Sequence, residues 1–175
     1  MSSTTGRKKI IIDTDPGVDD AMAIIMALDA HKREKIEVIA ITLVKGNCSL
    51  KDAERNVLRV LELFELEDTV GFSHSEFCTL TTKHLNTWGP EIQFKLFLLQ
   101  IPVYVGNENN LVVETTNDGF HGSDGFNDAE FSHYPDVGKI KRNEMGHQAI
   151  LRYTNEYPGL NKYKKILYFV ACNIG

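Results

Sequence analysis

Apolar runs alternate with longer amphipathic stretches along the chain. The runs are short and rich in β-branched or aromatic residues, as buried strands are, and they occupy residues 10–12, 36–44, 101–105 and 165–171. Stretches that favour helix lie between them, at residues 21–30, 51–66 and 142–157. This order predicts an α/β fold, an open and mostly parallel sheet with helices on both faces.

The helix expected at residues 51–66 carries the clearest periodicity. Apolar residues recur there at spacings of three and four, through Val57, Leu58 and Leu61. Ser49 followed by Asp52 resembles a capping box and marks the start of this helix. One face of the helix is therefore expected to pack on the sheet.

Residues 68–100 do not fit the alternation. Helix-to-strand connections in α/β units are usually two to six residues long, whereas about 33 residues separate these elements. They include a dense apolar run at 94–99 that either packs as an extra helix or stays exposed. We therefore expect one domain over residues 8–175, an atypical insertion at about 68–100 and a flexible N-terminus at 1–7.

Composition and charge indicate the cellular compartment of the chain and exclude some classes of partner. The net charge of -5 and the lack of a long basic stripe argue against nucleic acid. No stretch of about 18 apolar residues is present, and the polar N-terminus lacks the apolar centre of a signal peptide. Three cysteines are typical of free thiols rather than of a disulfide framework. These features predict a cytoplasmic chain with neither a nucleic acid nor a membrane as partner.

The most unusual feature is an acidic turn at residues 13–20. It contains Asp13, Asp15, Asp19 and Asp20, directly between the first predicted strand and the first predicted helix. Open α/β sheets bind their ligands at the carboxyl ends of strands. Each close pair of carboxylates repels by roughly 1 kcal/mol in water and by about 4 kcal/mol near a protein surface. A hard metal ion with oxygen ligands is the simplest group to offset this repulsion.

Several motif classes are excluded. The chain has neither a P-loop nor a Gly-x-Ser-x-Gly nucleophile motif. An EF-hand loop counted from Asp13 would place Val18 and Ile24 where glycine and glutamate are required. One remaining interpretation is a Mg²⁺-dependent phosphatase, in which Asp13 attacks phosphorus and Asp15 acts as acid and base. That interpretation explains only two of the four acids.

A closer resemblance covers more of the chain. The segment Ile11 to Ala21 resembles the opening motif of the inosine-uridine preferring nucleoside hydrolase family. Similar family features are Gly46-Asn47 after the second strand, Asn56 on the following helix, the strand at 101–106 and the loop His-Gly-Ser-Asp-Gly at 121–125. The resemblance covers most of residues 8–171, which is roughly the first half of a family domain.

The resemblance implies a Ca²⁺-dependent ribonucleoside hydrolase that cleaves the N-glycosidic bond to a free base and ribose. Asp15 would bind calcium and act as general base toward the attacking water. Asp20 would be a second calcium ligand, and the backbone carbonyl of Ala171 a further one.

The remaining roles concern the substrate, a ribonucleoside. Asp19 and Asn47 would hydrogen-bond the ribose hydroxyls, and His121 would lie near the nucleobase. Asp13 would support the metal site from beside it. An oxocarbenium-like transition state, which a pocket lined by carboxylates stabilises, makes these roles chemically consistent.

The sequence also departs from the family. Family members complete the calcium shell and the leaving-group acid with an Asp and a His from the second half of the domain, and this sequence ends at Gly175. Where the family has a Gly-Pro-Leu-Thr-Asn-like segment, the chain reads Cys-Asn-Ile-Gly. We therefore expect impaired catalysis, or a non-catalytic truncated variant with foreign sequence at the insertion. An unpaired sheet edge would make a homo-oligomer a further expected partner.

Overall fold

The computed structural model describes residues 7–67, 101–108, 119–157 and 167–171. Three of its elements are α-helices, namely α1 (Val18–Lys32), α2 (Leu50–Glu67) and α5 (Gly146–Glu156). The strands are β1 (Lys8–Thr14), β2 (Ile36–Leu43), β3 (Val103–Val105), β4 (Ile140–Lys141) and β5 (Leu167–Ala171). A short 3₁₀ helix, η1 (Val137–Lys139), leads directly into β4.

The strands form one parallel sheet in the order β4-β3-β2-β1-β5. The chain builds the sheet outward from β1 through β2, β3 and β4, and then crosses back to add β5 on the other side of β1. Because all strands are parallel, their carboxyl ends meet at one edge of the sheet. Thr14, the last residue of β1, is paired there with Leu43 of β2 and Ala171 of β5.

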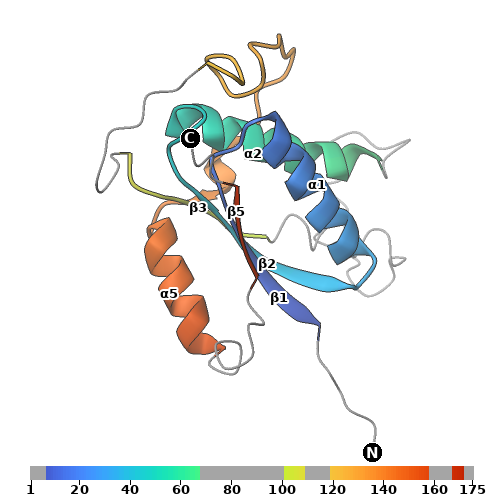
Figure 1. The fold of residues 1–175 in the computed structure, drawn as a ribbon, viewed down its shortest axis with the longest axis vertical. Coiled ribbons are helices and arrows are strands. Elements are labelled where there is room, and N and C mark those ends of the chain that lie inside the picture. The colour runs from blue at the N-terminus through green and yellow to red at the C-terminus, as the bar shows by residue number, and fades with distance from the viewer. Residues whose placement is uncertain (1–6, 68–100, 109–118, 158–166, 172–175) are drawn as a thin grey trace, which may run out of the picture.

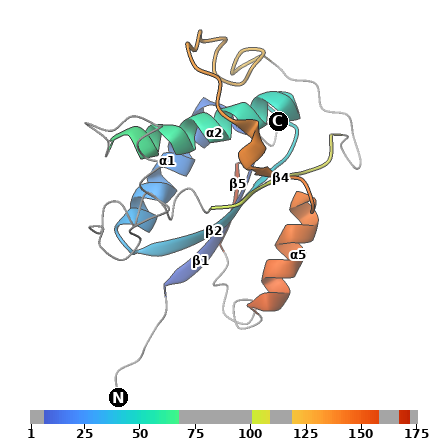
Figure 2. The same cartoon turned by 180° about the vertical axis from the view of Figure 1, so that it is seen from behind.

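Helices cover both faces of the sheet, as Figures 1 and 2 show from opposite sides. The helices α1 and α2 pack on one face, and α5 packs on the other. Successive side chains of β1 point to opposite faces of the sheet. Ile10 and Ile12 pack on the first face, and Ile11 packs on the second. The predicted fold class, an open parallel sheet with helices on both faces, is confirmed.

Local predictions were correct for the first βαβα unit. The periodic residues of α2, Val57, Leu58 and Leu61, are buried against the sheet. The hydroxyl of Ser49 accepts a hydrogen bond from the backbone N–H of Asp52 at 3.2 Å, so the predicted helix start is also observed.

The second half of the sheet differs from its prediction in detail. The helix expected to begin at 142 begins at Gly146, because Ile140 and Lys141 extend to pair with β3 as the short strand β4. This strand and η1 were not predicted, since a two-residue strand has no periodicity to detect. The strand expected at 101–105 begins at Val103, after Pro102, which has no N–H to donate.

Three expectations concern regions that the structure describes only in part or not at all. The predicted insertion at 68–100 lies outside the described residues. In the ranges that are described, no helix is long and apolar enough to cross a bilayer. Cys48, the cysteine that falls within these ranges, is buried and forms no disulfide.

A bidentate ion pair ties β4 to α2. Both terminal nitrogens of Arg142 donate to the carboxylate of Glu54, at 3.0 and 2.8 Å, and the Glu54 side chain is only 10% exposed. Arg142→Ala is expected to lower the free energy of unfolding by about 1 to 3 kcal/mol, because it leaves a buried carboxylate without its donors. Chemical denaturation measures the change.

The matched control is Arg33→Ala, which removes an exposed i,i+4 pair with Asp29 on α1. This change should cost about 0.5 kcal/mol or less. Equal losses for the two variants would contradict the structural role given to Arg142.

Candidate functional site

The acidic turn lies at the carboxyl edge of the sheet, as its sequence position predicted. Asp13 is inside β1, Asp15 follows the last residue of that strand, and Asp19 and Asp20 belong to the first turn of α1. The backbone N–H of Gly17 donates to Asp20 Oδ2 at 3.1 Å. This bond caps the helix with one of its own acids and fixes the Asp20 carboxylate at the sheet edge.

Asn47, just beyond β2, connects two of the acids. Its backbone N–H donates to Asp15 Oδ2 at 2.9 Å, and its side-chain Nδ2 donates to the Asp15 carbonyl at 3.1 Å and to Asp20 Oδ2 at 3.2 Å. The parallel register that places β2 beside β1 therefore assembles Asp15, Asp20 and Asn47 into one buried cluster.

His121 reaches the same edge from the loop that precedes η1. Its ring is buried, and its Nε2 lies 3.3 Å from Asp19 Oδ1. A Cβ atom on Gly17 would approach the His121 ring to 2.8 Å, so the ring packs directly on the acidic turn. Phe120 presents its ring edge-on to His121 and is itself exposed.

The other two predicted site residues lie beside this cluster. Asp13 accepts a 2.6 Å hydrogen bond from the Thr42 hydroxyl on β2 and makes its contact there rather than with Asn47. The register places Ala171 next to Thr14, one residue before Asp15, so its backbone is at the same edge. All seven predicted residues thus gather at one end of three adjacent strands, while the roles assigned to them stay predictions.

Burial makes the charged forms of these acids costly. The pKa of Asp20 is raised to about 6, chiefly by burial and also by the nearby charges of Asp15 and Asp19, against the hydrogen bonds from Gly17 and Asn47 that lower it. Burial likewise raises the pKa of Asp15, despite the hydrogen bond from the Asn47 backbone. Burial also raises the pKa of Asp13, against the hydrogen bond from Thr42. The site therefore favours either protons or a bound cation.

Unpaired oxygens test whether these residues suit a metal ion. Asp15 Oδ1 and Asp20 Oδ1 are both buried without a hydrogen-bond partner, as is the hydroxyl of Thr14, the residue directly before Asp15. Hard oxygen atoms of this kind are the ligands that Ca²⁺ selects. The donor set therefore fits calcium in chemistry.

The set is small in number. Among the residues that the structure describes, no three His, Cys, Asp or Glu side chains are grouped to hold a metal ion. Calcium takes six to eight oxygen ligands, so backbone carbonyls, water or substrate hydroxyls would have to supply most of them.

Sequence reasoning missed two supporting residues. Thr42, the partner of Asp13, was not named at all, and Asn56, a fully buried amide on α2, was named only as a feature shared with the family and was given no role. A polar residue inside an otherwise apolar helix face was the available signal for Asn56.

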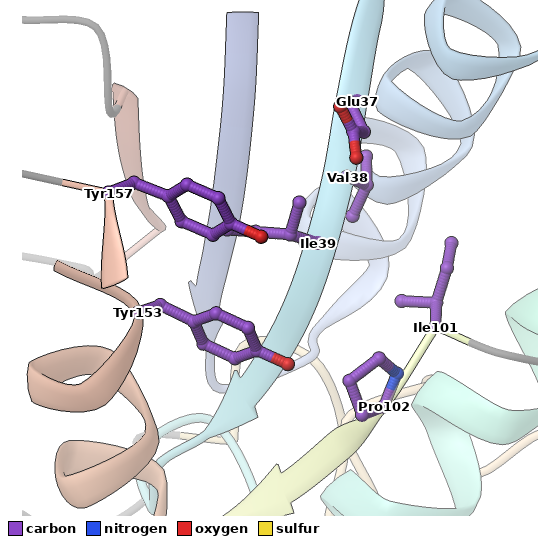
Figure 3. Close-up of a pocket in the computed structure, with 7 residues that line it drawn as sticks. All are labelled: Glu37, Val38, Ile39, Ile101, Pro102, Tyr153 and Tyr157. Carbon is purple, nitrogen blue, oxygen red and sulfur yellow. The ribbon is translucent and has the colours of Figure 1, made fainter. Parts of the chain in front are cut away.

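The molecule also has a pocket at the opposite end of the strands (Figure 3). It measures about 280 Å³ and is formed by the beginning of β2, the two residues before β3, one tyrosine of α5 and the tyrosine directly after that helix. It is lined by Glu37, Val38, Ile39, Ile101, Pro102, Tyr153 and Tyr157. None of the predicted site residues contributes to it.

Comparison with known proteins gives this geometry a context. Residues 10–83 match the sequence profile of the inosine-uridine preferring nucleoside hydrolases. The chain thus matches this family over its N-terminal portion. The match contains the acidic turn and Asn47. It continues past the end of α2 and ends at residue 83, within the predicted insertion at about 68–100.

Individual relatives also match only part of this chain. A probable uridine nucleosidase 2 of Arabidopsis thaliana is 53% identical over 57 residues, which are 33% of this chain and 17% of that protein. The inosine-uridine preferring nucleoside hydrolase of Crithidia fasciculata is 48% identical over 56 residues, 32% of this chain and 17% of the relative.

Solved structures extend the likeness over the whole fold. A plant nucleoside hydrolase superposes with a TM-score of 0.59 at 28% identity, covering 94% of this chain and 39% of that structure. An inosine-guanosine nucleoside hydrolase gives a TM-score of 0.57 at 27% identity, with 95% and 39% covered. The chain therefore spans well under half the length of the nucleoside hydrolases that it resembles.

Proposed function

We propose that the chain carries the calcium and ribose part of a nucleoside hydrolase site, within a single partial domain over residues 8–175. The observation that carries the proposal is the pair of buried, unpartnered oxygens, Asp15 Oδ1 and Asp20 Oδ1. These two acids would hold Ca²⁺, with the Ala171 carbonyl as a further ligand. Bound calcium would supply the positive charge that lowers the pKa of a nearby water.

The chain's own residues suggest how a ribonucleoside would be held and hydrolysed. Asp15 is the general base in this proposal, because its free oxygen is buried at the sheet edge while Asn47 fixes the other. Asp19 is 65% exposed and faces outward from the turn, where it would accept hydrogen bonds from ribose hydroxyls. His121, packed on Gly17, would contact the nucleobase.

Catalytic competence is a separate matter. Because the resemblance assigns an Asp ligand and a His acid to the second half of the family domain, we predict weak or undetectable hydrolysis of inosine and uridine by residues 1–175 assayed alone. A reducing-sugar assay on a panel of ribonucleosides measures it. Clear ribose release that disappears in Asp15→Ala would overturn this prediction and establish the chain as an active enzyme.

Metal and substrate binding test the proposed site itself. With only two carboxylates, Ca²⁺ is expected to bind with a dissociation constant of about 10⁻⁴ to 10⁻³ M. Calorimetric titration should show this binding in the wild type and its loss in Asp15→Asn. Inosine should perturb the NMR signals of Asn47 and His121 only when calcium is present. Absence of both effects would refute the proposal, and Mg²⁺-dependent phosphatase activity that requires Asp13 would favour the alternative.

A further inference from the structure

Asn56 is a fully buried amide on α2, the helix that runs beneath the acidic turn. Its neighbours Val57 and Leu58 are buried apolar residues of the sheet-facing core. A buried amide is costly unless its donors and acceptors are paired. The partners of Asn56 therefore indicate what an amide does at this position.

The two N–H groups of Asn56 reach two different loops. Nδ2 donates to the carbonyl of Pro16 at 3.2 Å and to the carbonyl of Asp124 at 2.7 Å, 40 and 68 positions away in the sequence. Its Oδ1 accepts from Arg59 one helical turn further on, at 3.0 Å. The amide is thus satisfied on both sides and fixed in orientation by its own helix.

Each carbonyl belongs to one half of the candidate site. Pro16 lies inside the acidic turn, directly after Asp15. Asp124 lies in the loop that begins with His121, and its carboxylate also accepts the backbone N–H groups of Phe126 and Asp128. The single nitrogen of Asn56 therefore sets the separation between the turn and this loop.

Close packing supports the same arrangement. Gly125 has a φ of +84°, and a Cβ atom there would lie 2.9 Å from the Pro16 carbonyl and 3.1 Å from Asn56 Nδ2. The loop backbone thus rests directly on the turn and on the amide. Only glycine allows this contact, because a side chain would be strained and would push the loop outward.

We propose that Asn56 is the positioning residue that holds the His121 loop on the acidic turn. The helix of Asn56 is packed in the core, so the position of Asn56 Nδ2 is fixed. The two hydrogen bonds from this atom therefore hold both loops in place. Loss of the donors leaves two carbonyls without partners and frees the loops to separate. The inference rests on the proposed function in that the two loops together form the proposed site.

The test separates this role from packing. Asn56→Asp keeps the shape but replaces the donors with acceptors, and Asn56→Leu keeps the approximate volume without polar atoms. Val57→Ala is the matched control, because it removes core packing on the same helix and leaves both hydrogen bonds from Asn56 to the loops in place. The main readout is the nuclear Overhauser effect between His121 Hδ2 and Gly17 Hα, which reports the contact between loop and turn.

Loss of this signal in both Asn56 variants, with retention in Val57→Ala, is the expected result. Calcium affinity should fall about tenfold in the same two variants, because the turn that carries Asp15 loses its anchor. Retention of the signal in either Asn56 variant would overturn the proposal, as would its loss in Val57→Ala. If the wild type binds no calcium, the proposed function fails, but the Overhauser comparison still decides the role of Asn56.

A second route keeps the test decisive if the Asn56 variants do not fold. Gly125→Ala leaves Asn56 intact and inserts a methyl group between the loop and the turn. It should abolish the same Overhauser signal. Gly119→Ala is its control, because that glycine also has a positive φ but has no atom within 4 Å of an added Cβ. Equal spectra for these two glycine variants would count against the proposal.

Discussion

Asp20→Asn is expected to make the calcium-free protein more stable at neutral pH. The pKa of Asp20 is 3.8 in its unperturbed form and about 6 in the folded protein. Between these values the folded state binds more protons than the unfolded state, so stability falls as pH rises from about 4 to 6 and stays low above. Asparagine never ionises, and its side-chain oxygen can still accept the bond from Gly17.

The size of the effect follows from the shift in pKa. Two units correspond to about 3 kcal/mol, which solvent screening reduces to about 1 to 2 kcal/mol. For a chain of this length, that gain raises the melting temperature by about 2 to 8 °C. The difference between variant and wild type should shrink as the pH falls from about 6 and should vanish below pH 3.8, where the Asp20 carboxyl is protonated in both the folded and the unfolded state.

Calcium should offset the advantage of Asp20→Asn and, at the tighter end of the expected affinity, reverse the order of the two proteins. At 10 mM, a site with a dissociation constant of about 10⁻⁴ to 10⁻³ M stabilises the wild type by about 1.4 to 2.7 kcal/mol. Asp20→Asn lacks one charged ligand and should gain little. Thermal melts from pH 4 to 7.5, with calcium and in buffer freed of divalent cations, measure both effects.

Asp19→Asn serves as the control for removal of charge alone. It removes one negative charge from the same helical turn at an exposed position. Its metal-free stability should stay within about 0.5 kcal/mol of wild type, as is usual for surface substitutions. If Asp20→Asn were less stable than wild type at pH 7 without calcium, the burial cost assigned to the Asp20 carboxylate would be wrong.

Gly46→Ala should damage the site severely. An added Cβ would lie 2.0 Å from Asp15 Oδ2, 2.7 Å from its Cγ and 2.9 Å from its Cβ. A short, buried side chain cannot move away without breaking the hydrogen bond from Asn47. We expect a loss of about 2 to 4 kcal/mol in the free energy of unfolding, from overpacking and the lost bond together.

Two measurements separate this effect from general destabilisation. Chemical denaturation gives the loss of stability, and calcium titration should show no binding, because the displaced carboxylate is a proposed ligand. Lys45→Ala, at the adjacent exposed position, should leave both properties unchanged. A Gly46→Ala protein that is as stable as wild type and still binds calcium would exclude the close approach of Gly46 to Asp15.

Sequence patterns were sufficient for the first half of the fold. Residues 10–12 and 36–44 carry apolar side chains on both faces of the predicted strand. This pattern is typical of a strand that is covered by helices on both sides, and both segments are strands of the parallel sheet. The periodic apolar residues of α2 likewise fixed which of its faces is buried. These elements are encoded locally, so a short window of sequence contains the information.

Long-range contacts were not predictable in the same way. The strand β4 exists because Ile140 and Lys141 pair with β3. A segment of two residues is too short to show a periodic pattern that would predict this pairing. The contact of Asn56 with Pro16 and Asp124 depends on where α2 lies relative to two loops. Such contacts follow from the packing of whole elements.

The sequence by itself determined that four acids follow a buried strand and precede a helix, and therefore that they lie at a ligand-binding edge of an α/β sheet. Only the tertiary structure decided how they differ. Asp15 and Asp20 are buried around Asn47 with one oxygen each left unpaired, Asp13 is bonded to Thr42, and Asp19 faces solvent near His121. The physical reason is that burial and hydrogen bonding depend on neighbours contributed by β2 and by the loop before η1.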